Sequence, residues 1–132
     1  MTVTIWHNPN CGTSRNVLEM IRQAGETPTV VEYLETGWDR DTLLRFAEST
    51  GEGLRGLLRV KGTPAEALGL TAADVSDEAL LTAMLAEPVL VNRPIVQTPK
   101  GTRLCRPSEA VLPLLDHPPE VFTKEDGEVV RT

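Results

Sequence analysis

The chain has 132 residues, two cysteines and a formal net charge of −6 at pH 7. This length suits one domain with a hydrophobic core of its own, and we expect a single domain over residues 1–132. Two cysteines are too few for a disulfide framework, and the acidic charge argues against nucleic acid as a partner. Because there is no long apolar stretch and no signal-peptide pattern, we expect a soluble, cytoplasmic protein without a membrane partner.

The first third of the sequence predicts a strand, a helix and a second strand. Apolar and β-branched residues predict the strands at residues 2–6 and 29–33. Residues 12–24 carry apolar side chains at helical spacing, and Gly25 is typical of a helix end. This order predicts a parallel pair of strands joined by a right-handed crossover.

The middle of the chain, about residues 39–87, predicts helices and no strand. Capping residues, glycines and prolines divide it into short segments. The expected helical segments are 39–50, 54–59, a turn opened by Thr63 and Pro64, and 76–86.

The last part of the chain predicts a β-hairpin and one further helix. The hairpin strands are expected at residues 95–97 and 102–105. The helix is expected to open at Pro107, and Pro113 should cut it short or kink it. From about residue 116 we expect a polar, loosely held tail.

The element order is therefore β-α-β, a helical block, and β-β-α. With the helical block set aside, this is the order of a thioredoxin-type mixed sheet flanked by helices. We predict a thioredoxin-like α/β fold with an all-helical insertion between the second and third strands.

Cys11 lies between the first expected strand and the first expected helix. A thiol there faces unpaired backbone N–H groups and the positive end of the helix dipole, and Arg15 lies about one helical turn further on. These influences favour a thiolate, so we predict a nucleophile near neutral pH. The same N–H groups suit an oxyanion substrate. The alternative is a buried structural cysteine that precedes a helix by chance.

Basic residues are concentrated in three windows that contain no Asp or Glu: residues 1–18, 53–65 and 88–108. If these windows meet in space, they make a cationic pocket suited to a small anion. The alternative is a chance grouping of solvated or paired surface charges. The basic residues of the windows are Arg15, Arg55, Arg59, Lys61, Arg93, Lys100, Arg103 and Arg106.

Several blocks of the sequence resemble the glutaredoxin-coupled arsenate reductases. Taken together they span essentially the whole chain, in order and at compatible spacing. The blocks are residues 7–16 (HNPNCGTSRN), 57–59 (LLR), 92–96 (NRPIV), 98–109 (TPKGTRLCRPSE) and 122–128 (FTKEDGE).

This resemblance implies that Cys11 is the catalytic nucleophile and that His7 tunes the surroundings of the thiol. It implies that three arginines, Arg59, Arg93 and Arg106, hold arsenate and the covalent adduct, since a planar guanidinium can grip two oxygens at once. The implied chemistry is attack of the thiolate on arsenic(V), loss of hydroxide and addition of glutathione as co-substrate. Glutaredoxin then resolves the mixed disulfide, and arsenite is released. No bound cofactor and no metal is implied, and we expect a monomer.

Other residues near these motifs have two interpretations each. Asn8 and Ser14 are expected to form hydrogen bonds around Cys11 and the helix start, although capping alone would explain either. His7 could simply end a strand. Pro94 matches the proline that is typically cis beside the reactive thiol of a thioredoxin fold, and the resemblance implies the same here. Cys105 is either a resolving thiol or a small core residue.

Two related chemistries fit poorly. Ser14 stands where a dithiol motif would have its second cysteine, and Val17 stands where a phosphatase-type loop would have arginine. Two alternatives remain: a glutathione-dependent thiol oxidoreductase of the same family without useful arsenate activity, and a non-catalytic regulatory binding module. The presence of all three arginines favours the arsenate-reducing enzyme, whereas Arg55 and Arg103 are expected to serve structure or solvent.

Overall fold

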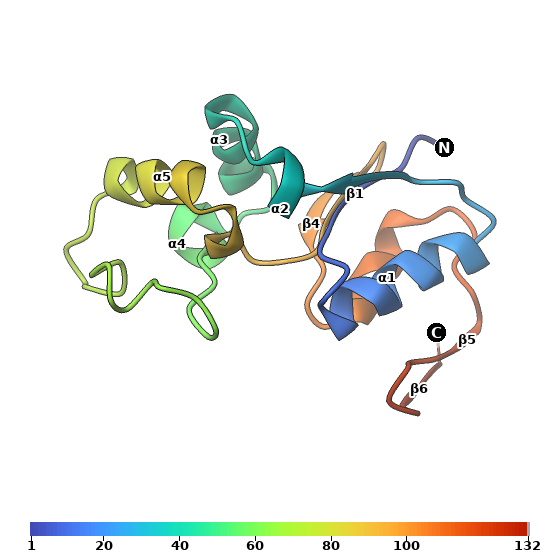
Figure 1. The fold of residues 1–132 in the computed structure, drawn as a ribbon. Helices are drawn as coiled ribbons and strands as arrows, with labels where there is room; N and C mark the ends of the chain where they lie inside the picture. The colour runs from blue at the N-terminus through green and yellow to red at the C-terminus, as the bar shows by residue number, and fades with distance from the viewer. Residues whose placement is uncertain (132) are drawn as a thin grey trace. The chain divides into compact units, whose positions relative to one another are not determined.

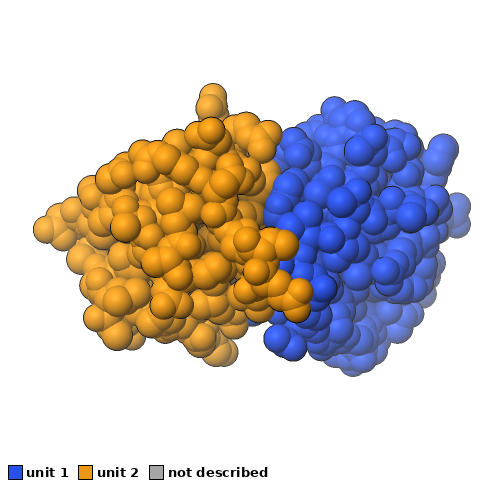
Figure 2. All heavy atoms as spheres, turned by 45° about the horizontal axis from the view of Figure 1, so that its top comes forward, with its two compact units in different colours: residues 1–32, 93–132 blue, residues 33–92 orange. Residues whose placement is uncertain are grey.

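A computed structural model describes residues 1–131 of the chain, which forms two compact units. Figure 2 colours the two units separately. Unit 1 combines residues 1–32 with residues 93–132, and unit 2 is Tyr33–Asn92. Each unit has its own set of buried side chains.

Unit 1 is built on a four-stranded mixed sheet with the strand order β2-β1-β3-β4. β1 pairs in parallel with β2 and antiparallel with β3, and β3 pairs antiparallel with β4. The parallel pair joined by a helix is the crossover that the sequence predicts. The elements of unit 1 are β1 (Thr4–His7), α1 (Gly12–Gln23), β2 (Thr29–Glu32), β3 (Ile95–Thr98), β4 (Gly101–Leu104), the 3₁₀ helix η2 (Ser108–Leu114), β5 (Val121–Thr123) and β6 (Val129–Arg131).

The core of unit 1 lies where α1 and η2 meet the sheet (Figure 1). Val3, directly before β1, and Ile5 within it are both buried in this core, while Val17 and Ile21 lie one turn apart on α1. Burying such side chains contributes about 1.5–3 kcal/mol each before entropy is counted. This mixed sheet flanked by helices confirms the predicted thioredoxin-like fold.

Unit 2 is the helical insertion between β2 and β3. Two of its helices begin at a side-chain cap: Asp39 Oδ2 accepts from Thr42 N at 3.2 Å, and Ser76 Oγ accepts from Ala79 N at 3.1 Å. Trp38 stacks on Tyr33 with ring centroids 4.9 Å apart. The elements of unit 2 are α2 (Tyr33–Thr36), α3 (Arg40–Ser49), α4 (Gly53–Leu57), α5 (Asp77–Ala86) and the 3₁₀ helix η1 (Pro88–Leu90).

The end of the chain differs from the loosely held tail expected from about residue 116. β5 and β6 form an antiparallel hairpin in which Phe122 is 3% exposed and belongs to the core of unit 1. Its turn is closed by Lys124 N, which donates to Glu128 O at 2.8 Å, and Gly127 supplies the positive φ of 94°. The expectation was wrong because one buried aromatic side chain in three-residue strands leaves almost no periodic signal in a polar sequence.

The last helix is the 3₁₀ helix η2, with Pro113 inside it. Proline lacks the N–H that an α-helix needs and its ring crowds the preceding turn, so the predicted disturbance takes the form of a tighter helix.

The burial of Phe122 gives a test of the hairpin. Phe122→Ala should lower the free energy of unfolding by about 3 kcal/mol or more, because it removes a buried ring and leaves a cavity. Val121→Ala, at a neighbouring side chain that is 46% exposed, should cost less than about 0.5 kcal/mol. Urea denaturation of both variants measures the difference. Equally small losses of unfolding free energy would show that the hairpin does not pack on the rest of unit 1.

Candidate active site

Cys11 occupies the N-cap position of α1, directly after the turn that follows β1. Its backbone is extended, with φ −106° and ψ 122°, and its amide donates to Asn8 O at 3.1 Å. The side chain of Asn8 closes the same turn, because its Oδ1 accepts from Asn10 N at 2.9 Å. This short turn fixes Cys11 at the positive end of the helix, as the sequence predicts.

His7, Asn8 and Ser14 form a buried hydrogen-bonded group behind the thiol. His7 Nδ1 lies 2.6 Å from Ser14 Oγ, and Asn8 N donates to the same Oγ at 3.1 Å. The two side chains are hydrogen-bonded, and the tautomer of His7 decides which of them donates. Burial, followed by the charges of Arg22 and Arg15, lowers the pKa of His7. A neutral His7 therefore ties the end of β1 to the first turn of α1.

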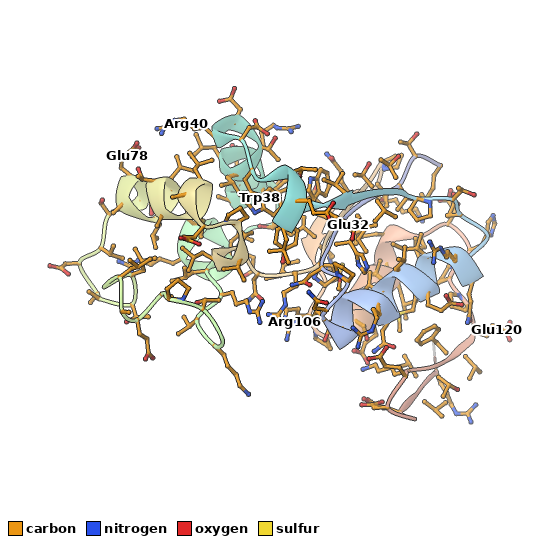
Figure 3. All side chains as sticks on the ribbon, viewed as in Figure 1. Glu32, Trp38, Arg40, Glu78, Arg106 and Glu120 are labelled. Atoms are coloured by element: carbon orange, nitrogen blue, oxygen red, sulfur yellow. The ribbon has the colours of Figure 1, made fainter. Side chains whose placement is uncertain are left out.

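Cys11 is 7% exposed, and specific neighbours favour the charged form of its thiol. Burial alone raises the pKa of Cys11, but the Ser14 backbone N–H, Arg93 and Arg106 outweigh it, so the pKa lies below its ordinary value. Arg106 Nη1 is 3.7 Å from Cys11 Sγ and also donates to Arg93 O at 3.2 Å. Figure 3 shows Arg106 beside the start of α1.

A pocket of about 400 Å³ opens at Cys11. It is bounded by the start of α1, by Arg93 and Arg106 on the strand ends, and by the turn at residues 124–128 of the C-terminal hairpin. Lys124, Glu125, Asp126 and Glu128 all line it, so the wall opposite the arginines carries both signs of charge. The first and third acid-free windows therefore meet as predicted, but acidic residues from the tail join them.

Arg15 lies within the electrostatic reach of Cys11, as expected, but a carboxylate compensates its charge. Its Nε and Nη2 donate to the two carboxylate oxygens of Glu125 at 3.0 and 2.7 Å, and its Nη1 donates to Pro9 O at 2.8 Å. The charge of Arg15 is thus compensated by a residue 110 positions away. Sequence reasoning included the tail segment in the family resemblance but had no signal for this pairing.

The middle acid-free window lies in unit 2, and there the arginines contact backbone carbonyls. Arg59 Nε donates to Lys61 O at 3.1 Å, and its role toward arsenate stays a prediction of the resemblance. Arg55 donates to three carbonyls in the segment 72–75, as expected of a structural residue. In unit 1, Arg103 donates to Ala110 O at 3.2 Å.

The second cysteine has the opposite environment from the first. Cys105 is fully buried in the core of unit 1, and burial raises its pKa to about 12. Both cysteines are free thiols. Of the two interpretations of Cys105, the structure favours the small core residue.

Two X-Pro peptide bonds next to the arginines of the pocket are cis. The Arg93–Pro94 bond is cis, as the resemblance implies, and Arg106–Pro107 is also cis. Within residues 1–131, no group of three or more His, Cys, Asp or Glu side chains is arranged to hold a metal ion. Over the same residues, no helix has the length and apolar character that a membrane span requires.

The mixed sheet, the cysteine at the start of α1 and the cis proline before β3 together define a thioredoxin-like thiol protein. The model of the ArsC family matches residues 6–114. An arsenate reductase of Yersinia enterocolitica is 55% identical over 129 residues, covering 97% of this chain and 92% of the relative. An arsenate reductase of Rhizobium meliloti strain 1021 is 56% identical over 131 residues, covering 98% and 94%.

A solved structure gives the same result. The arsenate reductase from Vibrio cholerae superimposes with a TM-score of 0.82 at 38% identity, covering 87% of this chain and 98% of that one. The chain belongs to the ArsC family.

The lowered pKa of His7 predicts a pH dependence of stability. Because the unfolded chain binds a proton at His7 more readily than the folded one, the free energy of unfolding should fall as the pH drops below about 6.5. One such group contributes at most about 1.4 kcal/mol per pH unit. His7→Asn keeps an acceptor near Ser14 but cannot titrate, so its unfolding free energy should change less between pH 7 and 5.5. His117→Asn, at an exposed histidine, is the control, and an undiminished loss in His7→Asn would contradict the assignment.

The contact between Arg106 and the sulfur predicts the reactivity of Cys11. Arg106→Gln should slow alkylation of Cys11 by iodoacetamide at pH 7 by roughly fivefold, because a positive charge beside a partly solvated thiolate contributes about 1 kcal/mol. Sulfate should protect Cys11 in the wild type and less in the variant. Arg103→Gln is the matched control, since Arg103 donates to Ala110 O. If both variants lost reactivity equally, general positive charge rather than Arg106 would control the thiol.

Proposed function

We propose that this chain is an arsenate reductase that uses Cys11 as its nucleophile. The observation that carries the proposal is the sulfur at the start of α1, 3.7 Å from a guanidinium nitrogen and open to a polar pocket. The high identity to arsenate reductases over nearly their full length supports the same substrate. A helix start and an arginine are the groups that stabilise a tetrahedral oxyanion.

Arsenate binding is assigned to the arginines beside the thiol. Arg106 contacts the sulfur and Arg93 lines the same pocket, so an anion held by both would lie against Cys11. Arg59 completes the set by family resemblance. Each guanidinium can bind two oxygens of arsenate. The arginines therefore orient the arsenic atom toward the sulfur as well as attract the negative charge of the oxyanion.

The reaction consumes two thiols for the two electrons that arsenic(V) accepts. The Cys11 thiolate forms an S–As bond, and an arsenic oxygen leaves as hydroxide, which takes a proton to become water. Glutathione then adds through its sulfur and displaces a second oxygen. When the two sulfurs form a disulfide, one of the two As–S bonding pairs becomes the S–S bond and the other stays on arsenic as a lone pair. Arsenic thereby gains two electrons and, after water adds, leaves as arsenite.

An external thiol is required because the chain supplies no second one at the site. Ser14 stands three residues after Cys11, and Cys105 is buried with a pKa raised to about 12, so it yields almost no thiolate. Glutathione fills this role, and glutaredoxin, which suits mixed disulfides with glutathione, restores Cys11. Two free cysteines and a supply of glutathione support a cytoplasmic location.

The remaining predicted residues act as positioning residues. Ser14 and Asn8 hold the turn before α1, His7 holds Ser14, and Pro94 follows Arg93 at the strand end. We propose that the protein works as a monomer, since the thiol and the arginine that touches it belong to one chain.

Arsenite formation in the presence of glutathione and glutaredoxin tests this function. Cys11→Ser should reduce turnover by at least about 10³-fold, because a hydroxyl supplies almost no anion at neutral pH. Cys105→Ala should retain most of the activity, since Cys105 only packs. Equal loss in the two variants would show that the thiol roles are wrongly assigned.

The choice of donor separates this mechanism from an internal dithiol. Glutathione with glutaredoxin should support many turnovers, whereas thioredoxin alone should support few. Under limiting donor, mass spectrometry should find glutathione on Cys11. A trapped Cys11–Cys105 disulfide with efficient cycling by thioredoxin would overturn the mechanism, and glutathione exchange without arsenite would identify a thiol oxidoreductase.

A further inference from the structure

The cations around the start of α1 differ in what compensates their charge. Arg15 is bound by both carboxylate oxygens of Glu125. Lys124 is largely buried, and its Nζ donates to Glu109 and to Glu128, each at 3.2 Å. Arg106 instead donates to a carbonyl and to the sulfur of Cys11. Glu125 and Glu128 of the hairpin turn, together with Glu109 of η2, therefore compensate the charges of Arg15 and Lys124.

Glu125 is held in a defined position against the helix start. Its backbone N donates to Asn16 Oδ1 at 3.0 Å, and its side chain makes the two bonds to Arg15. The carboxylate also approaches Gly12 so closely that a Cβ there would lie 2.8 Å from Oε1. A side chain at position 12 would therefore displace the end of the Glu125 side chain, which lies against the residue that follows Cys11.

We propose that Glu125 is a specificity-determining residue that cancels the charge of Arg15 beside the nucleophile and thereby confines anion binding to the Arg106 side of the pocket. An uncompensated Arg15 would offer a second cationic position within the first turn of α1. An oxyanion held there would be bound without being aligned on the sulfur. Glu125 repels an anion from that position, so the anion binds at the guanidinium of Arg106, which contacts Cys11 Sγ.

This proposal rests on the proposed function only in naming arsenate as the anion that binds. The electrostatic field around Cys11 is the same whatever the substrate is. Arg15 and Glu125 carry opposite charges. Neutralising one of them alone should therefore shift the ionisation of Cys11 and the binding of anions in one direction, and neutralising the other should shift both in the opposite direction. The charged or titratable groups that face Cys11 and the start of α1 from the surrounding elements are His7, Arg15, Arg93, Arg106, Lys124, Glu125, Asp126 and Glu128.

The test is a double-mutant cycle of Glu125→Gln, Arg15→Gln and both together. The readouts are the pH profile of Cys11 alkylation by iodoacetamide and the sulfate concentration that halves the alkylation rate. Neither readout needs arsenate turnover, so their outcome is independent of the proposed function. Mass spectrometry locates the label on Cys11.

We expect opposite changes of about two- to fivefold, the size of a charge acting near a partly exposed site. Glu125→Gln should shift alkylation to lower pH and lower the half-protecting sulfate concentration. Arg15→Gln should shift alkylation to higher pH and raise that concentration. The double variant should lie near the wild type.

The pair Arg40–Glu78 in unit 2 supplies a matched control. It is also exposed and bidentate, with N–O distances of 2.8 and 2.9 Å, and both residues are labelled in Figure 3. Glu78→Gln should change neither readout. If Glu125→Gln and Arg15→Gln changed the readouts in the same direction, the Arg15–Glu125 pair would only hold the hairpin turn in place. If neither variant changed the readouts, the pair would not act on the site. Either result would overturn the proposal.

Discussion

A nearly buried thiol with a lowered pKa is the feature around which the site is arranged. Burial disfavours the charged form, so the thiolate persists only where other groups repay the lost hydration. The Ser14 amide, Arg93 and Arg106 do this, and they come from three separate parts of the chain. Strand register brings them together: Trp6 lies opposite Ile95, and Ile95 lies opposite Leu104. The residues that follow β1, precede β3 and follow β4 consequently share one end of the sheet.

The buried histidine contributes to this arrangement through geometry rather than charge. An imidazolium at His7 would stabilise a thiolate, but burial and two nearby arginines lower the pKa of His7, and Ser14 Oγ lies 2.6 Å from Nδ1. The neutral ring instead sets the position of Ser14, whose backbone N–H lowers the pKa of Cys11. A substitution at His7 would thus alter the pKa of Cys11 by shifting Ser14 in the first turn of α1.

The parts of the structure that were predictable from sequence depend on local patterns. The helix after Cys11 has an apolar face and a glycine stop, and the paired strands are β-branched or follow a turn, so α1, β2 and the β3–β4 hairpin follow from residues close together. The C-terminal hairpin depends on one buried ring, and the partner of Arg15 is 110 positions away. Contacts of that kind leave no periodicity. The charge pattern placed Arg93 and Arg106 among eight candidate basic residues, and the family resemblance singled them out and pointed to the cis proline.

The contrast between the two cysteines shows how position decides chemistry when the side chain is the same. Cys11 has amide and guanidinium partners that favour its thiolate, whereas Cys105 lies among apolar side chains and burial raises its pKa to about 12. A thiol that ionises so late is a poor nucleophile toward a sulfur–arsenic or disulfide intermediate near neutral pH. An open pocket of about 400 Å³ beside Cys11 also has room for more than one oxyanion, which occupies the space of only a few water molecules of ~30 Å³ each. This pocket is the route to Cys11 for the external thiol of the proposed mechanism, whereas Cys105 is fully buried.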